Sequence, residues 1–183
     1  GVSMDHNNMK LLYLRKLVTC IFLATLTLST VKAWEIEVSA GTTDESQTVL
    51  RFGFNQEWDA RFLDSSLGYF SGYWSLGLTH WEKGMYGKDA VSISFSPVLT
   101  YNFYTNNGLE PFIELGVGVA GFSRTKVGDQ NLGSAFNFED RLGFGARFGD
   151  HTLGARAIHY SNAGLKRPND GIENYSIYYS YKF

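Results

Sequence analysis

A histidine and a serine two positions apart, followed by a glutamate, are the residues of this 183-residue chain whose types and spacing suit a chemical reaction. His159 and Ser161 begin the stretch HYSNAGLKRPNDGIE, and Glu173 ends it. Residues i and i+2 of an extended strand point to the same face, so His159 and Ser161 would stand side by side. A base beside a hydroxyl is the arrangement that nucleophilic catalysis by serine requires.

The alternation on either side of the loop predicts that Glu173 lies on the same face of the sheet as His159 and Ser161. Before the loop, one face carries Leu153, Ala155, Ala157, His159 and Ser161. After it, one face carries Glu173, Tyr175, Ile177, Tyr179, Tyr181 and Phe183. If the two segments pair as a hairpin with their apolar faces aligned, Glu173 lands on the face of His159 and Ser161. The trio would then act as nucleophile, base and orienting carboxylate.

Two loop residues are candidates for an oxyanion hole, which needs donors aimed at the developing negative oxygen. Asn162 offers a side-chain amide, and the backbone N–H of Gly164 can approach a substrate closely. Turn formation explains Asn162, Gly164, Pro168 and Gly171 without any function, and from the residues alone that explanation is preferred. The trio is different, because a charged group at the end of an apolar, lipid-facing strand face is costly without a purpose.

Residues 1–33 are predicted to be a cleaved secretory signal peptide with a few residues upstream of it. Met9, or alternatively Met4, would start it; three basic residues precede an apolar run over 17–28, and small residues lead to a cleavage site after Ala33. A membrane helix is the competing interpretation. Twelve apolar residues are too few to span a bilayer, so cleavage is favoured.

The composition of the remaining chain excludes several classes of protein. Removal of residues 1–33 leaves 12 basic and 17 acidic residues, a formal net charge of −5, which argues against nucleic acid as a partner. Cys20 is the only cysteine and would leave with the signal peptide, so no disulfide framework is expected. No histidines and carboxylates have zinc-site spacing, and neither a metal nor an organic cofactor is expected.

Residues 34–183 are predicted to form one all-β domain, an eight-stranded antiparallel transmembrane β-barrel. Short alternating runs separated by turn residues give strands at about 35–43, 47–56, 69–81, 90–103, 110–122, 135–148, 151–161 and 173–183. One face of these runs is apolar and aromatic, and the other is small, polar or charged. A soluble sandwich or lipocalin-like barrel would also alternate, but its apolar face would point inward.

Charges and aromatic residues favour a barrel in the outer membrane of a Gram-negative bacterium. The polar faces carry charges that can pair in a lumen: Glu114, Glu139, Arg141, Arg147 and Arg156. The apolar faces carry aromatic residues near strand ends, as interfacial girdles require: Phe70, Tyr101, Phe103, Phe148, Tyr181 and Phe183. Asp140 falls on the apolar face of 135–148, which predicts a bulge, a position above the membrane or a role near the substrate.

Connection lengths predict the orientation of the barrel. The short connections 105–108 and 149–150 suit periplasmic turns, whereas 82–89, 123–134 and 162–172 are longer and suit the outside. His159 and Ser161 would then lie near the outer leaflet, where the substrate would be a membrane lipid and the reaction ester hydrolysis. The connection 57–68 is too long for a simple turn and is predicted to form a short helix on the inner rim.

The last 25 residues, HYSNAGLKRPNDGIENYSIYYSYKF, resemble the PagL family of outer-membrane lipid A 3-O-deacylases through the H-x-S-N start and the glutamate twelve positions after the serine. The resemblance implies a serine esterase that hydrolyses the ester-linked 3-hydroxyacyl chain at position 3 of lipid A, in the outer leaflet and without a cofactor. It implies a triad of Ser161, His159 and Glu173, with Asn162 and Gly164 in the oxyanion hole. Lipid A or lipopolysaccharide is then the substrate, and membrane lipids and a second copy in a homodimer are the other expected partners.

Two other hypotheses stay open at this point. One is a non-enzymatic small barrel that serves in adhesion or as a structural protein, which long protruding loops would favour. The other is a different lipid-active barrel of the outer membrane, such as a phospholipase or an acyl transferase. A calcium requirement or an acyl pocket inside the barrel would favour the latter.

Overall fold

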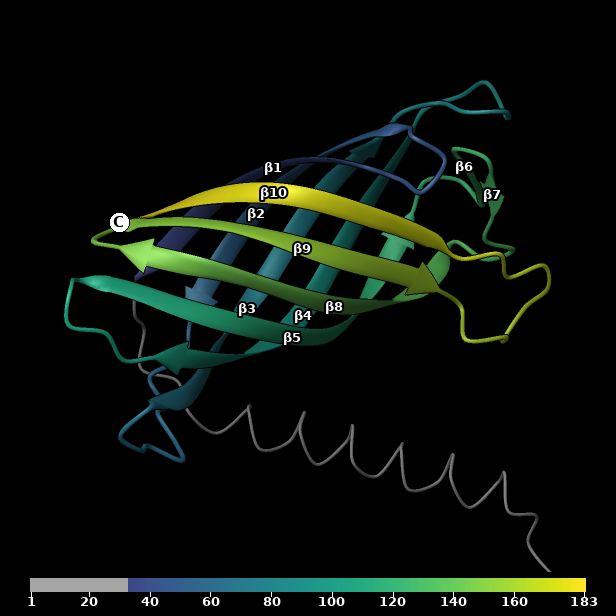
Figure 1. Ribbon diagram of the computed structural model, residues 1–183. Coiled ribbons are helices and arrows are strands. Elements are labelled where there is room, and N and C mark those ends of the chain that lie inside the picture. Colours follow the sequence, from purple (N-terminus) through teal and green to yellow (C-terminus); the bar gives the residue numbers. More distant parts are fainter. Residues whose placement is uncertain (1–32) are drawn as a thin grey trace, which may run out of the picture. The chain divides into compact units, whose positions relative to one another are not determined.

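The computed structural model describes residues 33–183, which form a closed antiparallel barrel (Figure 1). Its strands are β1 (Trp34–Thr42), β2 (Thr48–Glu57), β3 (Gly68–Trp81), β4 (Ala90–Phe103), β5 (Leu109–Phe122), β8 (Phe136–Phe148), β9 (His151–Ser161) and β10 (Ile172–Lys182). Each barrel strand pairs with the next one along the chain, and β1 closes the barrel on β10. The predicted fold class is confirmed, and each predicted strand boundary lies within one residue of the observed one.

The predicted signal peptide lies, apart from Ala33, outside the described residues. Between residues 33 and 183, no helix is long and apolar enough to cross a membrane.

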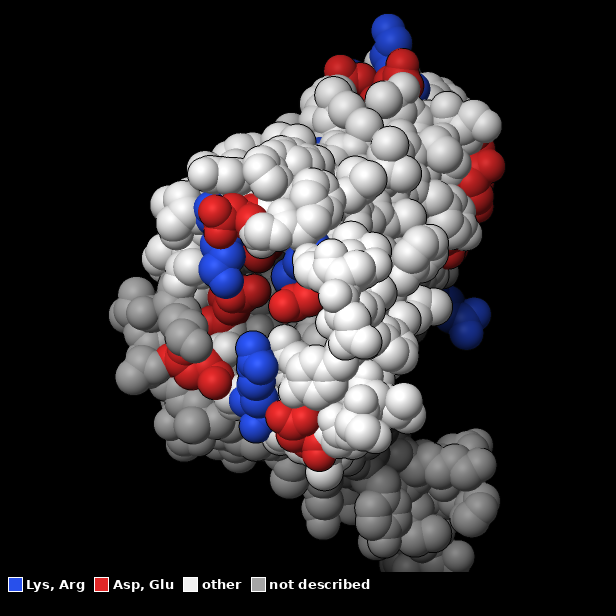
Figure 2. Space-filling model, turned by 60° about the vertical axis from the view of Figure 1, so that its left-hand side comes forward, with Lys and Arg blue, Asp and Glu red and all other residues white. Residues whose placement is uncertain are grey.

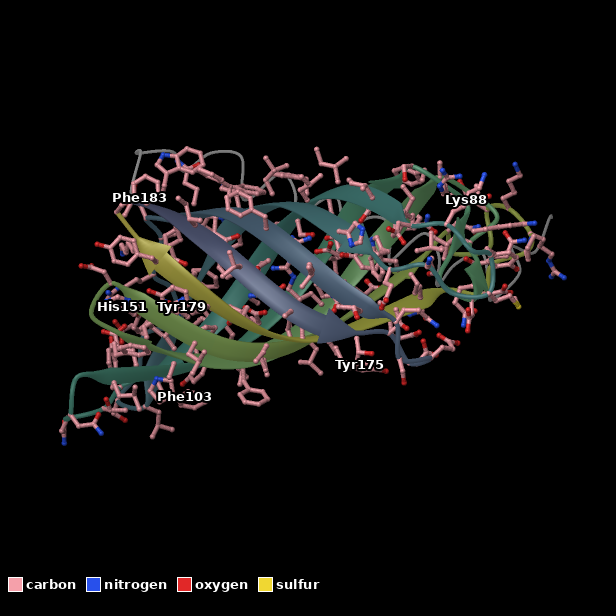
Figure 3. The ribbon with its side chains drawn as sticks, turned by 90° about the horizontal axis from the view of Figure 1, so that it is seen from above. Lys88, Phe103, His151, Tyr175, Tyr179 and Phe183 are labelled. Atoms are coloured by element: carbon pink, nitrogen blue, oxygen red, sulfur yellow. The ribbon has the colours of Figure 1, made fainter. Side chains whose placement is uncertain are left out.

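Alternation along the strands sorts side chains between an outer wall and the lumen. In β4, Ile93 and Phe95 are exposed on the wall, whereas Ser94 and Ser96 are buried inside. Figure 3 shows Phe103, His151, Tyr179 and Phe183 near the end of the barrel where the chain terminates, and Lys88 near the opposite end. The outer wall is therefore apolar and carries aromatic side chains at its rim.

Buried ion pairs fill the lumen. Arg156 lies 2.6 Å from Glu37 and 2.9 Å from Glu114, measured between nitrogen and carboxylate oxygen. Arg141 and Glu139 approach to 2.8 Å. The predicted pairing of lumenal charges is thus confirmed for these residues, and the cavity beside Arg156 measures only about 10 Å³.

One end of the barrel is capped by the connections 43–47, 82–89, 123–135 and 162–171; we call it the loop end. Within the third connection lies a small hairpin of β6 (Lys126–Val127) and β7 (Gln130–Asn131), which the sequence analysis did not predict. Val127 and Leu132 are fully buried in an apolar cluster that includes Trp81, Phe122 and Tyr160. The hairpin therefore belongs to the packed core of the loop end.

The predicted helix in 57–68 is wrong. The Trp58 N–H donates to the Gly72 carbonyl, and Phe62 and Phe70 exchange backbone hydrogen bonds, so the segment extends the β2–β3 hairpin irregularly. The Phe62 ring stacks on that of Phe70 at 5.8 Å. A short isolated helix is marginal, and here β3 offers backbone partners that a helix could not use.

Candidate active site

Neighbouring strands bring Glu173 and His159 together. The two residues are direct partners in the β9–β10 ladder, so the pairing expected from parity is present. His159 Nδ1 lies 2.7 Å from Glu173 Oε1. An ionised carboxylate only accepts hydrogen bonds, so Nδ1 carries the proton and Nε2 of the neutral ring keeps a free lone pair.

Ser161 is the last residue of β9 and shares the outer face with His159. Because Glu173 occupies Nδ1, the basic nitrogen left for the serine is His159 Nε2. In the described part of the chain, no hydrogen bond joins the Ser161 hydroxyl to this ring. Hydrogen bonds between catalytic groups are often long before substrate binds. Here the two-residue spacing along β9 places the Ser161 and His159 side chains on the same face.

Gly171 supports the imidazole from the loop side. Its φ is +74°, a left-handed conformation that glycine adopts without strain. A Cβ at this position would lie 2.8 Å from His159 Cε1. Turn formation, which the sequence predicts for Gly171, is one reason for glycine here; packing against the His159 ring is a second, which a single sequence does not signal.

Asn162, expected from the sequence to offer a side-chain amide to the oxyanion, points its side chain away from the outer wall in this structure. The residue is fully buried, and its Nδ2 donates to the carbonyls of Leu132 at 2.7 Å and Lys166 at 2.8 Å. Its backbone N–H donates to Asn169 Oδ1. All the N–H donors of Asn162 are therefore engaged in holding the loop together.

The next two residues leave backbone donors free. Ala163 and Gly164 both have positive φ, +54° and +76°, and both are exposed. Within residues 33–183, neither of their N–H groups has a hydrogen-bond partner, whereas the Leu165 N–H donates to the Asn162 carbonyl. The loop thus offers unpaired N–H groups two and three positions after Ser161.

Asp140 is the other acidic neighbour of His159 on the outer wall. It is the direct partner of His159 in the β8–β9 ladder and is exposed. The register of β8 with β5 and β9 is unbroken around Asp140, so the predicted bulge is absent. Its position beside His159 fits the expected role near the substrate.

An apolar groove on the outer wall begins beside these residues. It measures about 690 Å³ and crosses the wall of β5, β8, β9, β10 and β1. Ala155 and Ala157 form its floor, because they precede His159 on the same face of β9, and Leu142, Phe144, Tyr175 and Ile177 stand around them. Figure 3 shows Tyr175 on the outer side of the ribbon.

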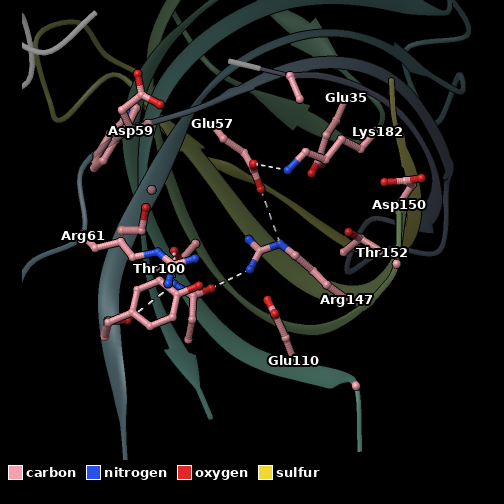
Figure 4. Close-up of a pocket in the computed structure, with 18 residues that line it drawn as sticks. Glu35, Glu57, Asp59, Arg61, Thr100, Glu110, Arg147, Asp150, Thr152 and Lys182 are labelled. Atoms are coloured by element: carbon pink, nitrogen blue, oxygen red, sulfur yellow. Dashed lines mark hydrogen bonds and ion pairs between the residues drawn. The ribbon is translucent and has the colours of Figure 1, made fainter. Parts of the chain in front are cut away.

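A second cavity lies at the other end of the barrel, away from the candidate site. It measures about 550 Å³ and is lined mainly by polar and charged side chains, among them Glu35, Glu57, Arg147 and Lys182 (Figure 4). Figure 2 shows charged side chains gathered around this hollow, beside a wall that is almost free of them. Arg147 and Lys182 both form ion pairs with Glu57 at this cavity. Arg147 therefore lies at the end of the barrel and not among the buried ion pairs of the lumen. Among the described residues, no group of three or more His, Cys, Asp or Glu side chains could hold a metal ion.

Comparison with known proteins finds one family. The family model "Lipid A 3-O-deacylase (PagL)" matches residues 47–182. Lipid A deacylase PagL of Pseudomonas aeruginosa is 46% identical over 170 residues, which cover 91% of this chain and 98% of the relative. Lipid A deacylase PagL of Bordetella bronchiseptica is 32% identical over 140 residues, or 76% of this chain and 72% of the relative. A crystal structure of the outer membrane enzyme PagL superposes with a TM-score of 0.78 at 49% identity, covering 80% of this chain and 98% of that one.

Proposed function

The chain belongs to the PagL family of lipid A 3-O-deacylases, and on that basis we propose that it uses Ser161 as nucleophile, His159 as base and Glu173 as the carboxylate that orients the base. The protein is a lipid A 3-O-deacylase of the outer membrane. The observation that carries the residue assignment is the 2.7 Å contact between His159 and Glu173 on the outer wall, beside Ser161.

The reaction proceeds by acyl transfer to the enzyme. Ser161 Oγ attacks the ester carbonyl while His159 Nε2 takes its proton, and Glu173 stabilises the imidazolium that forms. Collapse of the tetrahedral intermediate releases the sugar hydroxyl, which receives the proton from His159. A water molecule, deprotonated by the same nitrogen, then hydrolyses the acyl-serine ester and frees the hydroxy fatty acid.

The oxyanion of each tetrahedral intermediate needs donors near the serine. The exposed and unpaired N–H of Gly164 meets this need, together with that of Ala163. Asn162, the other residue expected in the oxyanion hole, contributes by fixing the loop that carries these donors, because its amide bonds to two backbone carbonyls.

The groove on the outer wall fits the acyl part of such a substrate. It is apolar, lies outside the barrel and begins next to His159, at Ala157. An acyl chain of a lipid in the membrane can therefore remain among apolar groups while its ester linkage meets Ser161. A water-soluble ester would have no reason to bind there, since the surrounding wall faces lipid.

The test is mass spectrometry of lipid A after incubation with the protein refolded in detergent, run beside the Ser161→Ala variant. We expect the wild type to remove one ester-linked hydroxyacyl chain and Ser161→Ala to remove none while keeping the heat-dependent gel mobility of a folded barrel. Deacylation by Ser161→Ala at the wild-type rate would refute the assignment of the nucleophile.

A further inference from the structure

We propose that the β6–β7 hairpin holds the loop 162–171 in its catalytic shape and that Asp170 is the positioning residue at this contact. The proposal rests on the proposed triad, because it concerns the placement of His159 and of the donors after Ser161. The hairpin and Asp170 lie outside the triad, and through this contact the hairpin gains a role in the reaction.

Asp170 and Asn131 form a reciprocal pair of hydrogen bonds. The Asn131 N–H donates to Asp170 Oδ2 at 2.9 Å, and the Asp170 N–H donates to the Asn131 carbonyl at 3.3 Å. Both bonds connect the end of β7 to the last residue before Gly171. A carboxylate that accepts from a backbone N–H makes one of the stronger hydrogen bonds in proteins.

The next residue of the hairpin segment holds the other end of the loop. The carbonyl of Leu132 accepts the hydrogen bond from Asn162 Nδ2 at 2.7 Å. Leu132 itself is fully buried in the apolar cluster of the loop end. Asn162 and Asp170, the first and ninth residues of the loop, therefore bond to two consecutive residues of the hairpin segment, Leu132 and Asn131.

Close backbone contact between the two segments leaves little room for a shift. Gly133 has a φ of +68°, and a Cβ there would lie 1.9 Å from the Pro168 carbonyl oxygen. The hairpin segment 131–133 thus contacts the loop at Asn162, Pro168 and Asp170. These contacts span the loop almost from end to end.

The contact at Asp170 reaches the catalytic histidine through one residue. Gly171 follows Asp170 and packs against the His159 ring, and Glu173 lies two residues further on. Without the bonds to Asn131, Asp170 and Gly171 lose their fixed distance from β9, and the ring loses its support. Misplacement of a catalytic group by about 1 Å can lower the rate on the order of 100-fold, without loss of the fold.

The experiment compares three variants of the refolded protein by kcat and KM for lipid A and by the rate at which a fluorophosphonate with an alkyl chain labels Ser161. For Asp170→Ala we expect kcat and the labelling rate to fall on the order of 100-fold, with KM nearly unchanged. Asp170→Asn keeps an acceptor oxygen and should recover most of both rates. Asp89→Ala is the matched control, because Asp89 is an exposed aspartate at the same end of the barrel that accepts from the Lys83 N–H at 2.8 Å, outside both the hairpin and the catalytic loop.

Equal kinetics of Asp170→Ala and Asp89→Ala, at equal thermal stability, would overturn the proposal. So would loss of activity that follows thermal stability alone and is not rescued by Asp170→Asn. Failure of the triad itself would look different: the fluorophosphonate would leave the wild type unlabelled at Ser161, or Ser161→Ala would stay active.

Discussion

Glu173 and His159 face each other across the β9–β10 ladder with 2.7 Å between Oε1 and Nδ1, on the outside of the barrel. Their side chains are 30% and 42% exposed, whereas the lumenal pair of Arg156 and Glu37 is 1% exposed on both sides. Strand parity separates the lumenal ion pairs from this outer hydrogen-bonded pair. The inner ones support the barrel, and the outer one is placed where a lipid can reach it.

Replacement of Glu173 by glutamine should inactivate the enzyme while leaving substrate binding intact. The amide can donate to Nδ1 and thereby favour the tautomer with the proton on Nε2, which cannot accept the serine proton. We expect kcat to fall by roughly 10³- to 10⁴-fold with little change in KM. Glu110→Gln, at the opposite end of the barrel, is the control. Activity of Glu173→Gln close to that of the control would contradict the role of the carboxylate.

Gly171→Ala should impair catalysis more than it impairs folding. The added methyl group would push against His159 Cε1, and the positive φ costs about 1 kcal/mol for a non-glycine residue. Gly149→Ala is matched in backbone strain, with φ +61°, but nothing lies within 4 Å of its Cβ. We expect similar losses of stability in urea for both variants and a loss of kcat for Gly171→Ala alone. Equal activities would show that the imidazole tolerates the displacement.

The two-residue alternation along the strands made two things predictable: the barrel, and the common face of His159, Ser161 and Glu173. It placed His159 and Ser161 on one face, and the hairpin register then brought Glu173 beside His159. The same parity points Asn162 inward, since it follows Ser161 directly. The complete burial of Asn162 agrees with this parity.

Contacts between connections were not predictable from local patterns. Asn131 and Asp170 are far apart along the chain, and the pairing of β8 with β9 brings their connections together. The composition of the segment 57–68 permits a short helix, whereas its backbone partners lie on β3. In both cases a tertiary contact decides the local conformation.

Arg156→Met should destabilise the barrel strongly. The change leaves Glu37 and Glu114 without the guanidinium that bonds to both, and an uncompensated buried charge costs about 3–5 kcal/mol. Unfolding in urea, followed by tryptophan fluorescence in lipid vesicles, measures the loss. Arg61→Met is the control, because Arg61 is exposed and stacks on Tyr69, so its removal should cost less than about 1 kcal/mol. Equal unfolding free energies for the two variants would contradict a structural role of the lumenal pairs.

Ala155→Phe should shorten the acyl chain that the enzyme accepts. Ala155 lies on the groove floor six residues before Ser161, about 20 Å along the strand at roughly 3.3 Å per residue. A phenyl ring there blocks the far part of the groove and leaves the part next to His159 open. We expect kcat/KM to fall roughly tenfold or more for lipid A with a long ester-linked chain and to change little for a short-chain analogue. Ile93→Phe, on the outer wall of β4 outside the groove, should affect neither substrate. Equal losses for long and short chains in Ala155→Phe would show that the groove does not hold the acyl chain.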